Sequence, residues 1–225
     1  EYPAFGLIDV EDPMATLPTH MSYPVWVKPI QSFSSQGAHY APDQAALRAA
    51  LETERQQLHS TGDAFDEVLK LLDLPEEVSD ISGHAYMVEE AVVGQQCTLE
   101  GYSWGDQVEV IGVVDSICYD QSSSFLRYQY PSRLPEHALA KMAETTRRVI
   151  GAIGLRNSTF NIEYFWDEST QRLSLLEINS RHSQSHAGVF RWVDGMPNHL
   201  AMMDLATGRR PHMPQGKGEY AIAAK

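Results

Sequence analysis

Two carboxylates, a carboxamide and a guanidinium lie within one short stretch of the chain, as Glu163, Glu177, Asn179 and Arg181. The carboxylate and amide oxygens are hard ligands, which suit Mg2+ or Mn2+ rather than zinc. Arg181 stays ionised at any working pH and could hold a carboxylate or a phosphoryl group beside the metal. The four side chains therefore indicate a divalent-cation site that adjoins a site for an anion.

The sequence around these residues predicts a β hairpin that would position them. Apolar and polar side chains alternate along residues 160–165, Leu173–Asn179 can form a second strand, and residues 167–171 have the composition of a turn. Because side chains alternate between the two faces of a strand, Glu177 and Asn179 must share a face.

The register of the hairpin decides whether Glu163 joins that face. We expect Glu163 to pair opposite Leu175, which would place Glu163 and Glu177 diagonally on one face and within reach of a shared ion. A slip by one residue would move the two carboxylates to opposite faces. The alternative interpretation is a hairpin with unrelated acidic side chains on its surface.

Upstream, Lys28 lies near the end of a short β-branched strand, Tyr23–Pro29, and a loop of small polar residues follows. Backbone N–H groups of such a loop can donate to phosphate oxygens, and the lysine ammonium adds a point charge. The spacing is not that of a P-loop. A strand-end lysine in contact with solvent is the alternative interpretation.

The remaining pattern predicts further helices and strands. Apolar stripes predict helices over residues 42–59, 63–72, 136–153 and 196–206. Alternating or β-branched runs predict strands over residues 84–93, 98–110 and 112–119, with a turn at 104–107. His182 and His186, one helical turn apart, could bind zinc, but we favour a loop that shapes a substrate pocket because Gly188 follows.

The composition argues against some classes of partner. The chain has 225 residues, a net charge of −13 and a hydrophobic fraction of 43%. These values fit one large domain or two lobes, and they argue against nucleic acid or an anionic membrane as partner. Cys97 and Cys118 are the only cysteines, so we expect a reducing cytoplasm rather than a disulfide framework.

No apolar run reaches the length of a membrane span, and no signal peptide is visible. The first residues contain neither an initiator methionine nor a charged leader, and the last residues resemble a strand cut short. We therefore expect the chain to be a piece of a longer protein.

The hairpin motifs resemble those of a known family. Phe160–Phe165 followed by Leu175–Arg181 resembles the metal-binding hairpin of the ATP-grasp superfamily, whose usual form is F-x-x-E-F and then E-x-N-x-R. The resemblance is to its carboxylate–amine or carboxylate–thiol ligases and, more distantly, to biotin carboxylase, and it extends upstream to Tyr23. It implies an α+β ATP-grasp fold, with two α+β lobes and ATP held between them.

The resemblance also implies roles for individual residues. Glu163, Glu177 and Asn179 would hold Mg2+ (or Mn2+), while Arg181 and Lys28 would be catalytic, Lys28 by contacting the phosphates of ATP. The other expected ATP contacts are Ser34, Ser35, Gln36 and Gly37 in the lid loop, Glu89, Glu90 and Val92 at the adenine, and Gln96 at the ribose, where the family often has glutamate. The expected substrate-side residues are Glu100, Arg127 and Arg133, together with Asp115.

On this interpretation the chain has one main domain. Residues 1–22 form an irregular leading segment, and residues 23–210 form the ATP-grasp domain, with a lid lobe over about 23–90 and a C-terminal lobe over about 91–210. Residues 211–225 begin a truncated C-terminal segment. The N-terminal lobe that precedes the domain in this family would be absent.

The implied reaction activates a carboxylate as an acyl phosphate, which an amine attacks to give an amide, ADP and phosphate. The expected partners are small-molecule carboxylate and amine substrates, without nucleic acid or membrane; a homodimer is possible, and the expected location is cytoplasmic. Two alternatives stay open: an ATP-grasp module that binds nucleotide without turnover, and an ATP-grasp kinase or carboxylase-like enzyme. Ser185 stands where the biotin-carboxylase branch has glutamate, which argues against bicarbonate activation.

Overall fold

The computed structural model consists of two compact units, residues 3–92 and residues 93–225 together with 1–2. The residues that it describes are 2–10, 12, 15–30, 37–55, 59–76, 81–119 and 124–225, without the side chains of 59–61. Both units combine helices with antiparallel sheets, which confirms the predicted α+β class.

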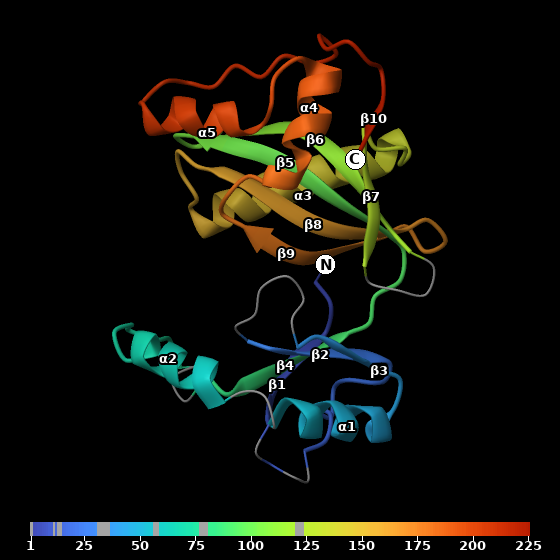
Figure 1. The fold of residues 1–225 in the computed structure, drawn as a ribbon, viewed down its shortest axis with the longest axis vertical. Helices are drawn as coiled ribbons and strands as arrows, with labels where there is room; N and C mark the ends of the chain where they lie inside the picture. Colours follow the sequence, from blue (N-terminus) through green and yellow to red (C-terminus); the bar gives the residue numbers. More distant parts are fainter. Residues whose placement is uncertain are drawn as a thin grey trace. The chain divides into compact units, whose positions relative to one another are not determined.

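The N-terminal unit, residues 3–92, contains a four-stranded antiparallel sheet in the order β1-β4-β2-β3 (Figure 1). Its strands are β1 Phe5–Asp9, β2 Val25–Pro29, β3 His39–Ala41 and β4 Ala85–Glu90, and its helices are α1 Gln44–Arg55 and α2 His59–Leu69. The apolar stripe of α1 packs against alternate residues of the strands in a common core, which includes Val25, Val27, Leu47, Leu51 and Val88.

Part of the predicted irregular leading segment is instead a strand. Residues Phe5–Asp9 pair with β4, with Phe5 opposite Glu89 and Asp9 opposite Ala85. Only Ile8 of this strand is buried, so hydrophobic periodicity gives almost no signal for it. Backbone pairing along β4, which the local sequence does not encode, forms this strand.

The C-terminal unit contains a six-stranded antiparallel sheet in the order β10-β7-β6-β5-β8-β9 (Figure 1). Its strands are β5 Gln95–Trp104, β6 Gln107–Cys118, β7 Phe125–Tyr130, β8 Thr159–Asp167, β9 Arg172–Asn179 and β10 Ala223–Ala224. Its helices are α3 Glu136–Ile153, α4 Ala187–Asp194 and α5 His199–Ala206, and a short 3-10 helix, Gln184–His186, precedes α4. Gly105 and Asp106 join β5 to β6, which confirms the predicted turn.

Helices pack on both faces of this sheet. One face packs on α3, and its core includes Leu99, Met142, Ile150, Ile162 and Tyr164. The other face packs on α4 and α5, and its core includes Val114, Tyr130, Phe190, Ala201 and Leu205. The even-numbered residues of β8 belong to the α3 core, so its odd-numbered residues point to the opposite face.

The helix predictions for this unit are confirmed in one place and wrong in another. The helix α3 has the predicted bounds and ends at Gly154, whose φ of 68° suits the left-handed position after a helix. The stretch 182–186, predicted as a loop, is coil followed by a short 3-10 helix, whereas α4 after it was not predicted and the predicted helix over 196–206 begins later, as α5. Burial of Val189, Phe190 and Val193 outweighs the roughly 1 kcal/mol that a glycine costs inside a helix.

In the described part of the chain, no helix is both long enough and apolar enough to span a bilayer.

Candidate active site

The strands β8 and β9 bring the predicted metal ligands to one face of the C-terminal sheet. Glu163 lies directly opposite Glu177, and Asn161 lies directly opposite Asn179. Residues opposite each other in an antiparallel pair share a face, with Cβ atoms about 5 Å apart. The predicted pairing of Glu163 with Leu175 is therefore wrong, although the two carboxylates do share a face.

A β-bulge sets this register. Glu163 pairs with Glu177, but the next residue, Tyr164, pairs with Leu175, so Leu176 is an extra residue in β9. Without the bulge, the turn would place Glu163 opposite Leu176 and would turn Glu177 towards α3. One unpaired residue thus decides whether the two carboxylates can bind one ion.

The bulge has a signal in the sequence. Leu173, Leu175 and Ile178 all belong to the core on the α3 side. The spacing between buried residues changes from two to three at Leu176, as an inserted residue in a strand requires. A strict alternation, which the sequence-based register assumed, misses this change.

A chain of amide hydrogen bonds orients Asn179. The carbonyl oxygen of Arg181 can only accept, so Asn161 donates its Nδ2 to that oxygen, at 2.9 Å. The Oδ1 of Asn161 then accepts from the Nδ2 of Asn179, at 3.2 Å. Among the residues that the structure describes, this order leaves the Oδ1 of Asn179 as the atom that can bind a cation.

The donor set fits a hard divalent cation. Glu177 is exposed, and Glu163 and Asn179 are half-buried, so an ion can approach all three. Two carboxylates directly opposite each other repel unless a cation or a proton offsets their charges. An all-oxygen set of this kind favours Mg2+ or Mn2+ over zinc.

Gln96, expected at the ribose, lies on the same face as the predicted metal ligands. Its Nε2 donates to the Oε2 of Glu163, at 3.1 Å. The structure therefore places Gln96 beside a predicted metal ligand, where it orients the carboxylate. Its contact with a ribose stays a prediction.

Arg181 lies two residues beyond the end of β9 and is exposed. Its Nη1 is 3.4 Å from the backbone oxygen of His182, a long hydrogen bond. In the described part of the chain, its guanidinium has no ion pair with a carboxylate. A cation with this environment is available to bind an anionic ligand.

Tyr128 is a residue of this face that the sequence analysis did not single out. It pairs with Ser116, whose hydroxyl lies 3.5 Å from that of Thr98, and Thr98 pairs with Glu163. Burial raises the pKa of Tyr128, and the Glu163 carboxylate raises it further. The hydroxyl is therefore protonated at neutral pH and can donate a hydrogen bond. The alternation of side chains along β7 could have assigned Tyr128 to this face of the sheet.

The expected substrate-side residues do not gather around the predicted metal ligands. Glu100 shares their face but is fully buried, and it bonds to Ser183 and His186. Arg127 pairs with Ile117, so it belongs to the opposite face of the sheet.

Asp115 and Arg133 meet at the segment before α3. The Asp115 carboxylate accepts from the hydroxyl of Ser132 and from the backbone N–H of Arg133. This buried carboxylate therefore holds the start of α3, while the Arg133 side chain is exposed. A role for Arg133 in substrate binding stays a prediction.

In the N-terminal unit, Lys28 and Glu89 form an ion pair, with Nζ and Oε2 2.5 Å apart. They lie diagonally across β2 and β4, on the face away from the α1 core. The side chain of Glu90, the next residue in β4, points to the other face of the sheet. There its Oε2 accepts a hydrogen bond from the Ala4 N–H at 3.2 Å. The structure thus separates the side chains of two residues that were both expected at the adenine.

The other expected nucleotide contacts of this unit are only partly described. Val92 lies in the coil after β4, and Gly37 has a φ of 71°, which favours glycine. The positions of Ser34, Ser35 and Gln36 lie outside the described residues.

A group of possible metal ligands in the same unit has a structural explanation. Asp63, Asp66 and His84 offer ligand atoms within 4.8 Å of one another. His84 Nε2 lies 2.9 Å from Asp63 Oδ1, and the Gly83 N–H donates to Asp66 Oδ1. These contacts tie α2 to the turn before β4.

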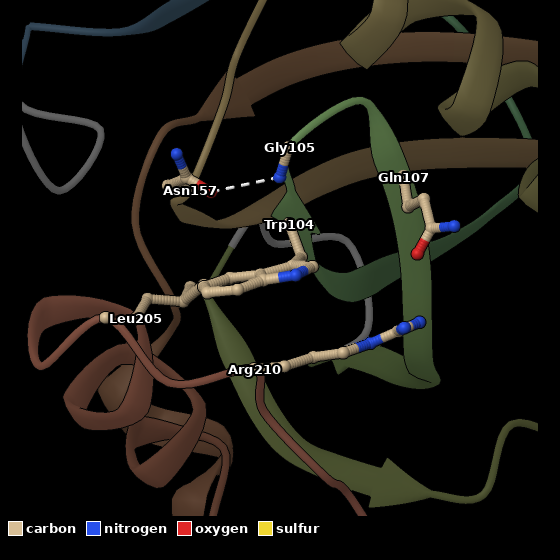
Figure 2. A pocket seen from close by; sticks show the side chains of 7 residues that line it. Trp104, Gly105, Gln107, Asn157, Leu205 and Arg210 are labelled. Atoms are coloured by element: carbon tan, nitrogen blue, oxygen red, sulfur yellow. Dashed lines mark hydrogen bonds between the residues drawn. The ribbon is translucent and has the colours of Figure 1, made fainter.

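An open hollow of about 640 Å³ lies at the β5–β6 turn of the C-terminal unit, and Figure 2 shows the side chains that line it. Its lining residues are Trp104, Gly105, Gln107, Asn157, Leu205, Gly208 and Arg210. The Asn157 Oδ1 accepts the Gly105 N–H at 2.9 Å, and the Trp104 indole extends towards Leu205 (Figure 2). None of the predicted site residues lines this hollow, which lies at the end of β5 remote from Gln96.

Comparison with known proteins relates most of the chain to one family. Residues 21–188 match the ATP-grasp domain family. No curated protein matches the chain.

Solved structures with the same fold come from several enzymes. An L-amino acid ligase from Bacillus licheniformis is 14% identical with a TM-score of 0.68, over 100% of this chain and 48% of that one. The N5-carboxyaminoimidazole synthetase of Staphylococcus aureus, complexed with ADP, is 15% identical with a TM-score of 0.62, over 94% of this chain and 48% of that one. The biotin carboxylase domain dimer of the Hydrogenobacter thermophilus 2-oxoglutarate carboxylase, with magnesium ADP and bicarbonate, is 17% identical with a TM-score of 0.61, over 87% and 39%. The chain thus spans less than half the length of these proteins, and the likeness shows the fold alone.

Proposed function

This chain belongs to the ATP-grasp family, and from that premise we propose that it is part of an ATP-dependent ligase that joins a carboxylate to an amine. The carboxylate would be activated as an acyl phosphate, and the amine would displace phosphate, which gives an amide, ADP and phosphate. The observation that carries the proposal is the polar face of the β8–β9 hairpin. There two opposed carboxylates and an oriented carboxamide oxygen lie beside an arginine that has no acidic partner among the described residues.

The residues of this face fit a magnesium ion. Glu163, Glu177 and the Oδ1 of Asn179 would hold it, and Gln96 would keep the Glu163 carboxylate in place. When bound, such an ion supplies charge neutralisation at the phosphate oxygens of ATP. Magnesium ADP in the related Hydrogenobacter thermophilus structure is consistent with this assignment.

Two cationic side chains would act on the phosphates. Arg181 would stabilise the charge that develops on the transferring phosphoryl group or on the acyl phosphate. Lys28 would contact the nucleotide phosphates, and its ion pair with Glu89 keeps the ammonium at a defined place on the sheet of its own unit. The adenine contacts of Glu89 and Val92 rest on the family resemblance.

Two other functions are weaker candidates. A carboxylase-like activity is disfavoured because Ser185 replaces the glutamate that activates bicarbonate in the biotin-carboxylase branch. A module that binds nucleotide without turnover is disfavoured because the metal ligands and Arg181 are all present. A homodimer and a cytoplasmic location stay predictions.

The first test is binding of ATP and Mg2+, measured by thermal unfolding. A ligand that binds only the folded state raises the melting temperature by an amount set by its concentration over its dissociation constant. We expect ATP with Mg2+ to raise the melting temperature of the wild type. Glu177→Ala should lose the Mg2+-dependent part of that increase, whereas Glu144→Ala on the exposed side of α3 should retain it. An equal increase in both variants would contradict the metal assignment.

The second test is the substrate requirement for ADP release. With mixed amino acids as carboxylate and amine donors, a ligase should release ADP only when both kinds of substrate are present. Blocking the amines by N-acetylation should stop sustained release, since no amide can form. Release that continues at the same rate without any amine would indicate a kinase, and no release beside clear ATP binding would indicate a binding module.

A further inference from the structure

The segment that follows β9 is held at each successive residue by side chains from other elements. The backbone oxygens of Ser180 and Arg181 accept from Ser158 Oγ at 3.3 Å and from Asn161 Nδ2 at 2.9 Å. The His182 N–H donates to Thr159 Oγ1 at 3.1 Å. The chain around Arg181 is therefore fixed to β8 and to the loop before it, rather than free as a surface loop would be.

Glu100 anchors the same segment from β5. Its side chain is fully buried, and the backbone N–H of Ser183 lies 3.0 Å from Oε1 and 3.3 Å from Oε2. The Nδ1 of His186 lies 2.8 Å from Oε1. An ionised carboxylate can only accept hydrogen bonds, so His186 Nδ1 donates to it.

His186 is itself enclosed. Its ring is 2% exposed and packs edge-on against Tyr128, with ring centroids 4.7 Å apart. Asn198, just before α5, donates to the backbone oxygen of Ser183 at 2.8 Å. Glu100 and His186 thus form a closed pair that is bonded to the segment at Ser183 and cannot reach a ligand directly without rearrangement.

A buried pair of this kind contributes little net stability compared with well-packed apolar residues, because removing both groups from water is unfavourable. What it does provide is a fixed geometry. Arg181 differs from this pair. The peptide groups before and after it are both hydrogen-bonded, while its guanidinium is exposed and has no carboxylate partner in the described part of the chain.

We propose that Glu100 and His186 are positioning residues, which hold the Ser180–His186 segment so that Arg181 can bind the phosphoryl group that ATP transfers. This inference rests on the proposed function. Glu100 then acts through Arg181, and not on the substrate as the sequence analysis expected. A small displacement of a catalytic group lowers its effect strongly, so loosening the anchor should mimic the loss of Arg181 itself.

The test compares two nucleotides that differ by the transferred phosphoryl group. The dissociation constants of ADP and of the non-hydrolysable triphosphate AMP-PNP, each with Mg2+, are measured by calorimetry on the intact protein. The wild type should prefer the triphosphate, and Arg181→Ala should lower that preference about tenfold, the scale of one charge-assisted hydrogen bond. Glu100→Ala should lower it similarly, and the double variant should be no worse than Arg181→Ala alone.

Matched variants separate positioning from general destabilisation. Asp194 is another buried carboxylate of the same unit, and it bonds to Tyr130 and Gly216 instead of the Arg181 segment. Asp194→Asn should reduce the melting temperature but leave the nucleotide preference unchanged. Glu100→Gln keeps an oxygen for the Ser183 N–H and should retain part of the preference. If Glu100→Ala does not fold, Glu100→Gln and His186→Asn replace it in the cycle with Arg181→Ala.

The outcomes distinguish this inference from the proposed function. If the wild type binds neither nucleotide with Mg2+, the proposed function fails. If it binds both and the Glu100 and His186 variants keep the wild-type preference, the positioning role is overturned. It is also overturned if their effects add fully to that of Arg181→Ala, or if Arg181→Ala itself leaves the preference unchanged.

Discussion

Replacing both Glu163 and Glu177 by glutamine is expected to lower the rate of Mg2+-dependent ADP formation by about a thousandfold or more. The two carboxylates supply the negative charge that holds the cation, and the Asn179 amide cannot replace it. A metal provides several kcal/mol of charge stabilisation in such reactions, and each 1.4 kcal/mol corresponds to a factor of ten in rate. The measurement is initial ADP release at saturating ATP and Mg2+, and ADP release near the wild-type rate would exclude these residues as the metal ligands.

The same double variant should be at least as stable as the wild type when no divalent cation is present. Glu163 lies directly opposite Glu177, and like charges at directly opposed positions destabilise a sheet. Glutamine preserves the volume and removes the repulsion. Thermal unfolding in EDTA measures this effect, with Glu144→Gln on α3 as the control for loss of an acidic side chain elsewhere. A marked decrease in melting temperature would show that the carboxylates have a structural role instead.

Truncating Phe160 to alanine is expected to destabilise the C-terminal unit by about 3–5 kcal/mol, the usual range for removing a buried phenyl ring. Phe160 is fully buried in the α3-side core. Its ring also fills the space beside Gly101, where an added Cβ would lie 2.5 Å from it. The cavity would open directly under the strand that carries Asn161 and Glu163. Thermal unfolding should show a decrease of roughly 10 °C in the melting temperature.

Phe125 provides the matched control for this truncation. It lies in β7 and is 41% exposed, so Phe125→Ala should change the melting temperature by no more than a few degrees. Equal decreases for the two variants would contradict the assignment of Phe160 to the core beneath the strand that carries Asn161 and Glu163.

The local sequence determined the parts of this protein that depend on periodicity and residue type. The helix α3 has the predicted bounds, because an amphipathic stripe and Gly154 at its end act within a few turns of chain. The β5–β6 turn was predicted because Gly105 and Asp106 suit a tight turn. The candidate metal ligands Glu163, Glu177 and Asn179 can be predicted from the sequence, since their oxygen chemistry and strand spacing are local properties.

Only the tertiary structure decided what depends on partners distant in the sequence. Strand β1 exists because it pairs with β4, and α4 forms across Gly188 because the sheet buries its apolar side. The burial of Glu100 against Ser183 and His186 likewise has no local signal. Contacts of this kind are made between segments far apart in the chain, so propensity and periodicity carry no record of them.

The opposed pair of Glu163 and Glu177 lies between these two cases. The residue types and the alternation of the strands are readable, but strict alternation does not give the pairing, because it depends on the bulge at Leu176. Packing of Leu175 and Ile178 against the α3 core selects that bulge, and the bulge turns Glu177 to the face of Glu163. The sequence by itself determined which atoms could bind the ion, and the packing of the sheet on α3 decided that they meet.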